Sequence, residues 1–100
     1  MNRGYIIEDI KNIDSEILET DLLDCEETLL QLNSLSTATL NRIHSELTQL
    51  AQMLQTDVAV VENINAKWEF DDETVCPTLT IDGFYRAARF RCGEVLQKFL

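Results

Sequence analysis

The sequence predicts an all-α protein: a small helical bundle or an elongated helical hairpin of three to four helices, with a short extended acidic connector. Apolar residues recur three and four positions apart in several segments, which is the spacing of one helix face. Hydrophobic residues make up 45% of the chain, enough for a packed core. The length of 100 residues fits one helical domain, 1–100.

The first two predicted helices cover residues 4–18 and 21–33. The first carries isoleucines at helical spacing: Ile6, Ile10, Ile13 and Ile17. The apolar period then slips, and a second register begins: Leu22, Cys25, Leu29 and Leu32. We therefore expect a break or kink near Thr20, with the side chain of Thr20 or Asp21 capping the second helix.

The third predicted helix covers residues 36–68. Ser36 is a suitable N-cap, flanked by leucines at the spacing of a hydrophobic staple. The apolar row of this helix is Leu40, Ile43, Leu47, Leu50, Leu54, Val58, Val61 and Trp68. Unbroken, the helix would be about 50 Å long, whereas a compact chain of this size is about 33 Å across. Either the helix breaks near Thr56-Asp57 or the molecule is elongated.

Residues 69–82 form the predicted connector. It contains three consecutive acids, Asp71 to Glu73, and Pro77, which disfavours helix before it. The last predicted helix covers residues 83–99, with Asp82 as its N-cap. Its apolar stripe is Phe84, Ala88, Cys92, Val95 and Phe99.

The chain is strongly acidic, with 18 acids, 8 bases and a net charge of −10. This balance argues against broad neutralisation of nucleic-acid phosphates and against docking on an anionic membrane. The longest apolar run, residues 58–61, is too short to cross a bilayer, and no secretory signal peptide is recognisable. We expect a cytoplasmic protein.

The sequence predicts no enzyme, no cofactor and no metal site. The single histidine, His44, lies beside the apolar row with no nucleophile facing it. The three cysteines, Cys25, Cys76 and Cys92, are widely spaced and include no close pair. We therefore expect free thiols rather than disulfides or zinc ligands.

Charge is unevenly distributed along the chain. Residues 1–35 hold nine acids and two bases, whereas residues 83–100 hold one acid and four bases. The arginines of the last helix have two interpretations. Arg86 and Arg89 pair with acids of the first helix or the connector, or they form with Tyr85 and Arg91 a docking patch for an acidic partner.

These features predict a non-enzymatic protein-interaction module, a small acidic inhibitor or regulator. A dense acidic face imitates duplex phosphates and can occupy the basic, nucleic-acid-binding surface of a target enzyme. In general character, such proteins resemble phage-type inhibitors and immunity proteins. Aromatic residues and arginines near this face would serve as anchors. The expected partner-binding residues are Glu8, Asp9, Asp14, Glu16, Asp24, Glu27, Trp68, Phe70, Tyr85, Arg86 and Arg89.

Two alternative functions remain open. An apolar stripe left outside the bundle would make the chain a structural or adaptor protein that acts through homodimerisation. The basic last helix, with its aromatic residues, would instead bind nucleic acid weakly. Salt dependence discriminates charge-driven from apolar association.

Overall fold

The computed structural model describes residues 3–69 and 81–100. Within these residues the chain is helical and contains no strand, which confirms the all-α prediction. The elements are α1 (Arg3–Asn12), the π-helical turn η1 (Ile13–Ile17), α2 (Glu26–Asn33), α3 (Thr37–Glu69) and α4 (Ile81–Phe99).

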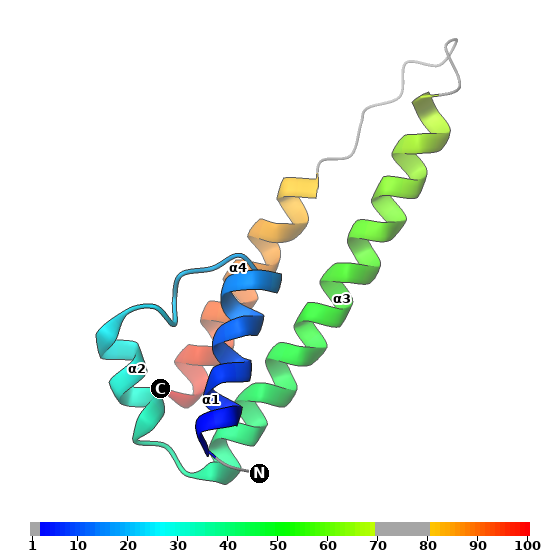
Figure 1. Ribbon diagram of the computed structural model, residues 1–100. Helices are drawn as coiled ribbons and strands as arrows, with labels where there is room; N and C mark the ends of the chain where they lie inside the picture. The colour runs from blue at the N-terminus through cyan, green and yellow to red at the C-terminus, as the bar shows by residue number, and fades with distance from the viewer. Residues whose placement is uncertain (1–2, 70–80) are drawn as a thin grey trace.

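Helix α3 is the central element of an elongated helical hairpin. It is unbroken over 33 residues, and α4 lies antiparallel along it (Figure 1). Helix α1 packs against the N-terminal half of α3, and α2 lies beside the C-terminal half of α4 (Figure 1). The molecule measures 58 × 24 × 18 Å. Of the two forms that the sequence allowed, the elongated one is present and the break near Thr56-Asp57 is absent.

The apolar row predicted for α3 forms the centre of the core. Leu40, Ile43 and Leu47 are fully buried, and Leu50 and Leu54 are almost so. Each such side chain contributes about 1.5–3 kcal/mol of burial free energy. The isoleucine row of α1 packs against this row and is buried at three positions: Ile6, Ile10 and Ile13.

Helix α4 contributes a narrower buried stripe than predicted. Its buried residues are Ala88, Cys92 and Leu96, whereas Phe84, Val95 and Phe99 are partly buried. The helix begins at Ile81, and Asp82 lies in its first turn rather than at the N-cap. The predicted connector, residues 69–82, falls mainly on residues 70–80, which lie outside the described part of the chain.

Between α1 and α2 the helix is interrupted. The predicted break near Thr20 is present, but the second helix begins only at Glu26, with Cys25 at its N-cap position. Neither Thr20 nor Asp21 caps it. The hydroxyl of Thr20 donates instead to the carboxylate of Asp14.

The predicted apolar register of the second helix is right at Leu32, which is fully buried, and wrong at Leu22 and Cys25, and the turn η1 explains the difference. A π-helical turn holds one more residue per hydrogen-bonded ring than an α-helix, and the amide of Leu18 donates to the carbonyl oxygen of Ile13 at 2.9 Å. Glu19 then adopts a φ of 54°, which ends the helix. The buried residues after η1 are Leu18, Thr20 and Leu23, whereas Leu22 and Cys25 are exposed.

A side-chain hydrogen bond links the start of α1 to the end of α2, close to where α3 begins. The guanidinium of Arg3 donates to the carbonyl oxygen of Asn33, so the two ends of residues 3–33 meet. Ser36 then caps α3 as predicted, because its hydroxyl accepts a hydrogen bond from the amide of Thr39 at 3.2 Å.

Thr56→Pro tests the continuity of α3. Proline removes an amide hydrogen and clashes with the preceding turn, so in a helix interior it costs about 3 kcal/mol or more. We expect the free energy of unfolding to fall by that amount in urea titrations followed by circular dichroism. Thr56→Ala is the control, since it removes only the hydroxyl bonded to the Gln52 carbonyl. A proline variant as stable as the alanine variant would contradict a continuous helix.

Candidate interaction surfaces

The N-terminal third of the chain presents carboxylates to solvent from α1, η1, the stretch after η1 and the first turn of α2. Figure 1 shows where these segments lie. The exposed acids are Glu8, Asp9, Glu16, Glu19, Asp21, Asp24, Glu26 and Glu27, which we call the acidic surface. Within the described residues, none of them forms an ion pair with a lysine or arginine, and Nε2 of His44 lies 3.9 Å from Oδ2 of Asp9. Five of the predicted partner-binding acids therefore reach solvent, and their charge is mostly not neutralised by described cations.

Asp14 is not part of the acidic surface, so its prediction as a partner-binding residue is wrong. The residue is fully buried, because it follows Ile10 by four positions on the inward row of α1. Its Oδ2 accepts a hydrogen bond from the amide of Leu23 at 3.2 Å. Its Oδ1 accepts from the hydroxyl of Thr20 and from the thiol of Cys92, in α4, at 3.5 Å. The carboxylate thus joins η1, the following stretch and α4.

Burial governs the ionisation of this cluster. It raises the pKa of Asp14, against the hydrogen bonds from Thr20, Leu23 and Cys92, which favour the charged form. Burial, together with the adjacent Asp14 carboxylate, raises the pKa of Cys92 to about 12. Cys92 is therefore a neutral thiol at neutral pH and retains the hydrogen that it donates to Asp14.

Helix α4 exposes basic and aromatic side chains. Arg86 and Arg89 are exposed, Phe90 is 70% exposed and Tyr85 is half-buried. In the described part of the chain, no ion pair joins Arg86, Arg89 or Arg91 to a carboxylate. Pairing with the first helix is thus not observed, and the docking-patch interpretation stays a prediction. The Trp68 side chain and Phe70, the other predicted anchors, lie outside the described residues.

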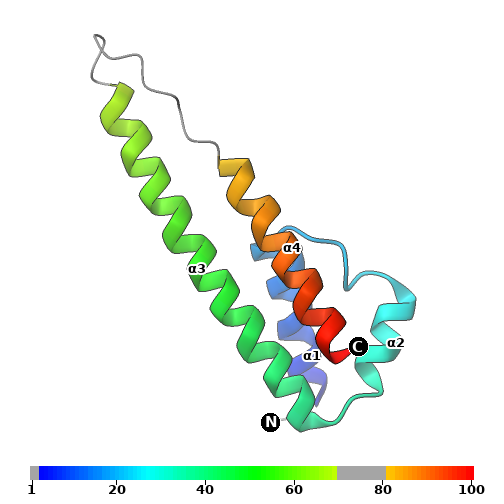
Figure 2. The same ribbon diagram turned by 180° about the vertical axis from the view of Figure 1, so that it is seen from behind.

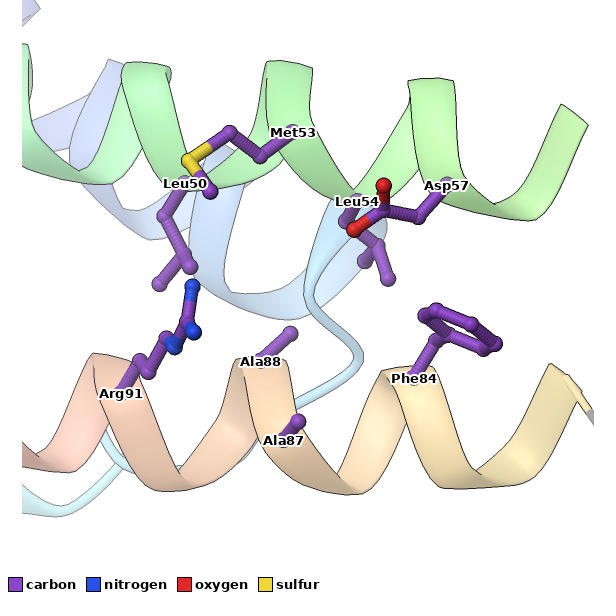
Figure 3. A pocket seen from close by; sticks show the side chains of 8 residues that line it. All are labelled: Leu50, Met53, Leu54, Asp57, Phe84, Ala87, Ala88 and Arg91. Carbon is purple, nitrogen blue, oxygen red and sulfur yellow. The ribbon is translucent and has the colours of Figure 1, made fainter. Parts of the chain in front are cut away.

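A groove between α3 and α4 is the feature that the sequence did not reveal. It lies on the side of the hairpin away from α1, where Figure 2 shows no other described helix over the pair. Its central part has a volume of about 190 Å³. The lining residues are Leu50, Met53, Leu54, Asp57, Phe84, Ala87, Ala88 and Arg91 (Figure 3). The groove continues toward the ion pair of Glu46 with Lys98, whose Oε1 and Nζ are 3.0 Å apart.

One signal in the sequence could have indicated this groove. Met53 and Val60 lie seven positions apart on α3, outside the predicted apolar row, and both are about half exposed, at 51% and 52%. Residues seven apart share a helix face. A second apolar stripe on α3 was therefore present in the sequence, but nothing in the sequence told which side α1 would leave open.

No protein-family model, curated protein or solved structure matches this chain. None of the helices within residues 3–69 and 81–100 combines the length and apolar character needed to cross a membrane. In the same residues, no group of three or more acidic, histidine or cysteine side chains is arranged to hold a metal ion. Cys25 and Cys92 are free thiols, and Cys76 lies outside the described residues.

Asp14→Asn tests the ionisation of the buried carboxyl. Because folding raises the pKa of Asp14, the native state holds this proton more tightly, so its contribution to the free energy of unfolding falls as pH rises through the interval between the unfolded and folded pKa values. Asparagine does not titrate and keeps one acceptor, its Oδ1, for the amide of Leu23. Its Nδ2 can donate to the hydroxyl of Thr20, which is also able to accept. We expect the variant to gain stability relative to wild type as pH rises from about 4 to neutral, measured by urea unfolding at several pH values.

Asp14→Ala is the companion variant. It removes both acceptors and leaves the amide of Leu23 unpaired in the core, so we expect a loss of about 1–3 kcal/mol. If the difference between Asp14→Asn and wild type did not change with pH, the raised pKa of Asp14 would be contradicted.

Proposed function

We propose that this chain is a non-enzymatic protein-interaction module whose acidic surface binds a basic surface of a protein partner, as an inhibitor or regulator would. The observation that supports this is the set of eight exposed carboxylates, none of which pairs with a lysine or arginine within the described residues. Opposite charge on a partner speeds association and favours one orientation of the complex.

The placement of these carboxylates supports binding over mere solubility. Acids distributed over the whole surface would also keep a helical protein in solution, yet the eight acids of the acidic surface all lie within residues 8–27. The backbone that carries them is held by two contacts, one from Arg3 to Asn33 and one from Leu23 to Asp14. A surface ordered before binding loses less conformational entropy on complex formation.

The chemistry of the proposed partner follows from the ligand that the acidic surface imitates. Carboxylates along an ordered backbone resemble the phosphates of a nucleic acid in charge, so a nucleic-acid-binding surface rich in lysine and arginine is complementary to them. The partner class that we propose is therefore a protein whose basic surface binds nucleic acid, and occupation of that surface would block it.

Salt dependence and charge neutralisation test the proposal. We expect a protein captured on the immobilised chain to bind less tightly as salt rises from low to moderate concentration, since the screening length falls to about 10 Å at 0.1 M. The triple variant Glu16→Gln, Asp24→Asn and Glu27→Gln removes three charges from the acidic surface. Its affinity in calorimetric titrations should be weaker by roughly tenfold, because exposed charge pairs contribute about 0.2–1 kcal/mol each.

A matched triple variant serves as the control. Glu62→Gln, Asp82→Asn and Glu94→Gln remove the same number of charges from exposed positions outside the acidic surface. We expect this variant to retain nearly the wild-type affinity. Equal weakening by both triples would indicate an effect of net charge alone, and binding that is insensitive to salt would contradict the proposal.

A further inference from the structure

The groove between α3 and α4 is a partly apolar surface that no described helix covers. Met53 is 51% exposed at its centre, and Val60 is 52% exposed further along the same face of α3. On the α4 side, the small side chain of Ala87 lies opposite Met53 (Figure 3) and permits close approach of another helix. Methionine side chains adapt their shape to the surface that they contact.

Opposite charges mark the two ends of this groove. Arg91 lies at one end, near Leu50, and Asp57 lies at the other end, across from Phe84 (Figure 3). Both charged residues are exposed. Within residues 3–69 and 81–100, neither of them forms an ion pair. The part of the groove between Leu50 and Phe84 therefore carries one cation, Arg91, and one anion, Asp57, separated by the apolar centre. Glu94 and Lys98 line its continuation beyond Arg91.

This arrangement is complementary to itself. A two-fold axis that crosses α3 and α4 between Met53 and Ala87 exchanges the two ends of the groove. Arg91 of each copy then reaches the level of Asp57 and Phe84 of the other copy. An ion pair between Arg91 of one copy and Asp57 of the other therefore forms twice, and each guanidinium also approaches the ring of Phe84 of the other copy. The apolar centres of the two grooves meet on the axis, where Met53 of one copy contacts the other copy.

The position of the acidic surface is compatible with this pairing. Helix α1 and η1 pack on the opposite side of the hairpin (Figures 1 and 2). No residue of α1 or η1 lines the groove, and repulsion between two chains of net charge −10 is weakened by distance and by salt. We propose that the α3–α4 groove binds a second copy of this chain in a two-fold symmetric dimer. This inference does not depend on the function proposed for the acidic surface.

Sedimentation equilibrium of the full chain at moderate salt tests the proposal. We expect a reversible monomer–dimer equilibrium with a dissociation constant on the order of micromolar, as for small interfaces. Asp57→Arg places two cations opposite each other, and Arg91→Asp places two anions opposite each other. Each variant alone should raise the dissociation constant at least about tenfold.

Mixing the two variants gives the decisive measurement. The Asp57→Arg variant presents two cations in its groove and the Arg91→Asp variant presents two anions. Each cation of one then faces an anion of the other, so an equimolar mixture should form the mixed dimer with an affinity near that of wild type. Arg86→Asp, at an exposed position outside the groove lining, is the matched control and should leave the dimer intact. Circular dichroism spectra should show that all variants are folded.

Three results would overturn the proposal. The first is a wild-type chain that remains monomeric over the whole concentration range. The second is dimerisation that both single variants leave unchanged, which would place the interface elsewhere. The third is a folded mixture of the two variants that does not associate, because that would remove the pairing between Asp57 and Arg91 of different copies.

Discussion

Burial of the apolar row of α3 is the interaction on which the rest of the structure depends. Leu40, Ile43 and Leu47 are inaccessible to solvent because α1 covers them on one side and α4 runs along the other. Helix α3 has 33 residues, however, whereas α1 has 10 and α4 has 19. Helices α1 and α4 are therefore too short to cover every face of α3 along its whole length. The same packing that creates the core therefore leaves one side of the α3–α4 pair without a helix over it among residues 3–69 and 81–100.

A buried carboxyl group fixes the path of the chain at the end of α1. Asp14 accepts hydrogen bonds from two positions in the stretch after η1 and from Cys92 in α4. Desolvation disfavours its charged form and raises its pKa, so ionisation of this group lowers the stability of the fold as pH rises. Its effect is geometric: it holds Thr20 and Leu23 inward and prevents α1 from continuing into α2. A polar contact of this kind selects one arrangement among several that would bury similar apolar area.

The sequence allowed accurate prediction where the α-helical period is regular. The row from Leu40 to Leu54 is buried as predicted, and Ser36 caps the helix, since both depend on local spacing. The prediction failed after Ile13, because a π-helical turn changes the residue spacing and a tertiary contact to Cys92, 78 positions away, draws Asp14 inward. The spacing from Ile10 to Asp14 was a visible clue. Met53 and Val60 were a visible sign of a second apolar stripe on α3, but the position of the open groove was not predictable, because it depends on which face of α3 is covered by α1.

The contact between Arg3 and Asn33 has a consequence for the stability of the N-terminal segment. It joins the first turn of α1 to the last carbonyl of α2, so residues 3–33 close into an arc. Helix α2, only 8 residues long, is too short to persist alone in water. The bond, worth about 0.5–1.5 kcal/mol, therefore stabilises the end of a helix that depends on the rest of the fold.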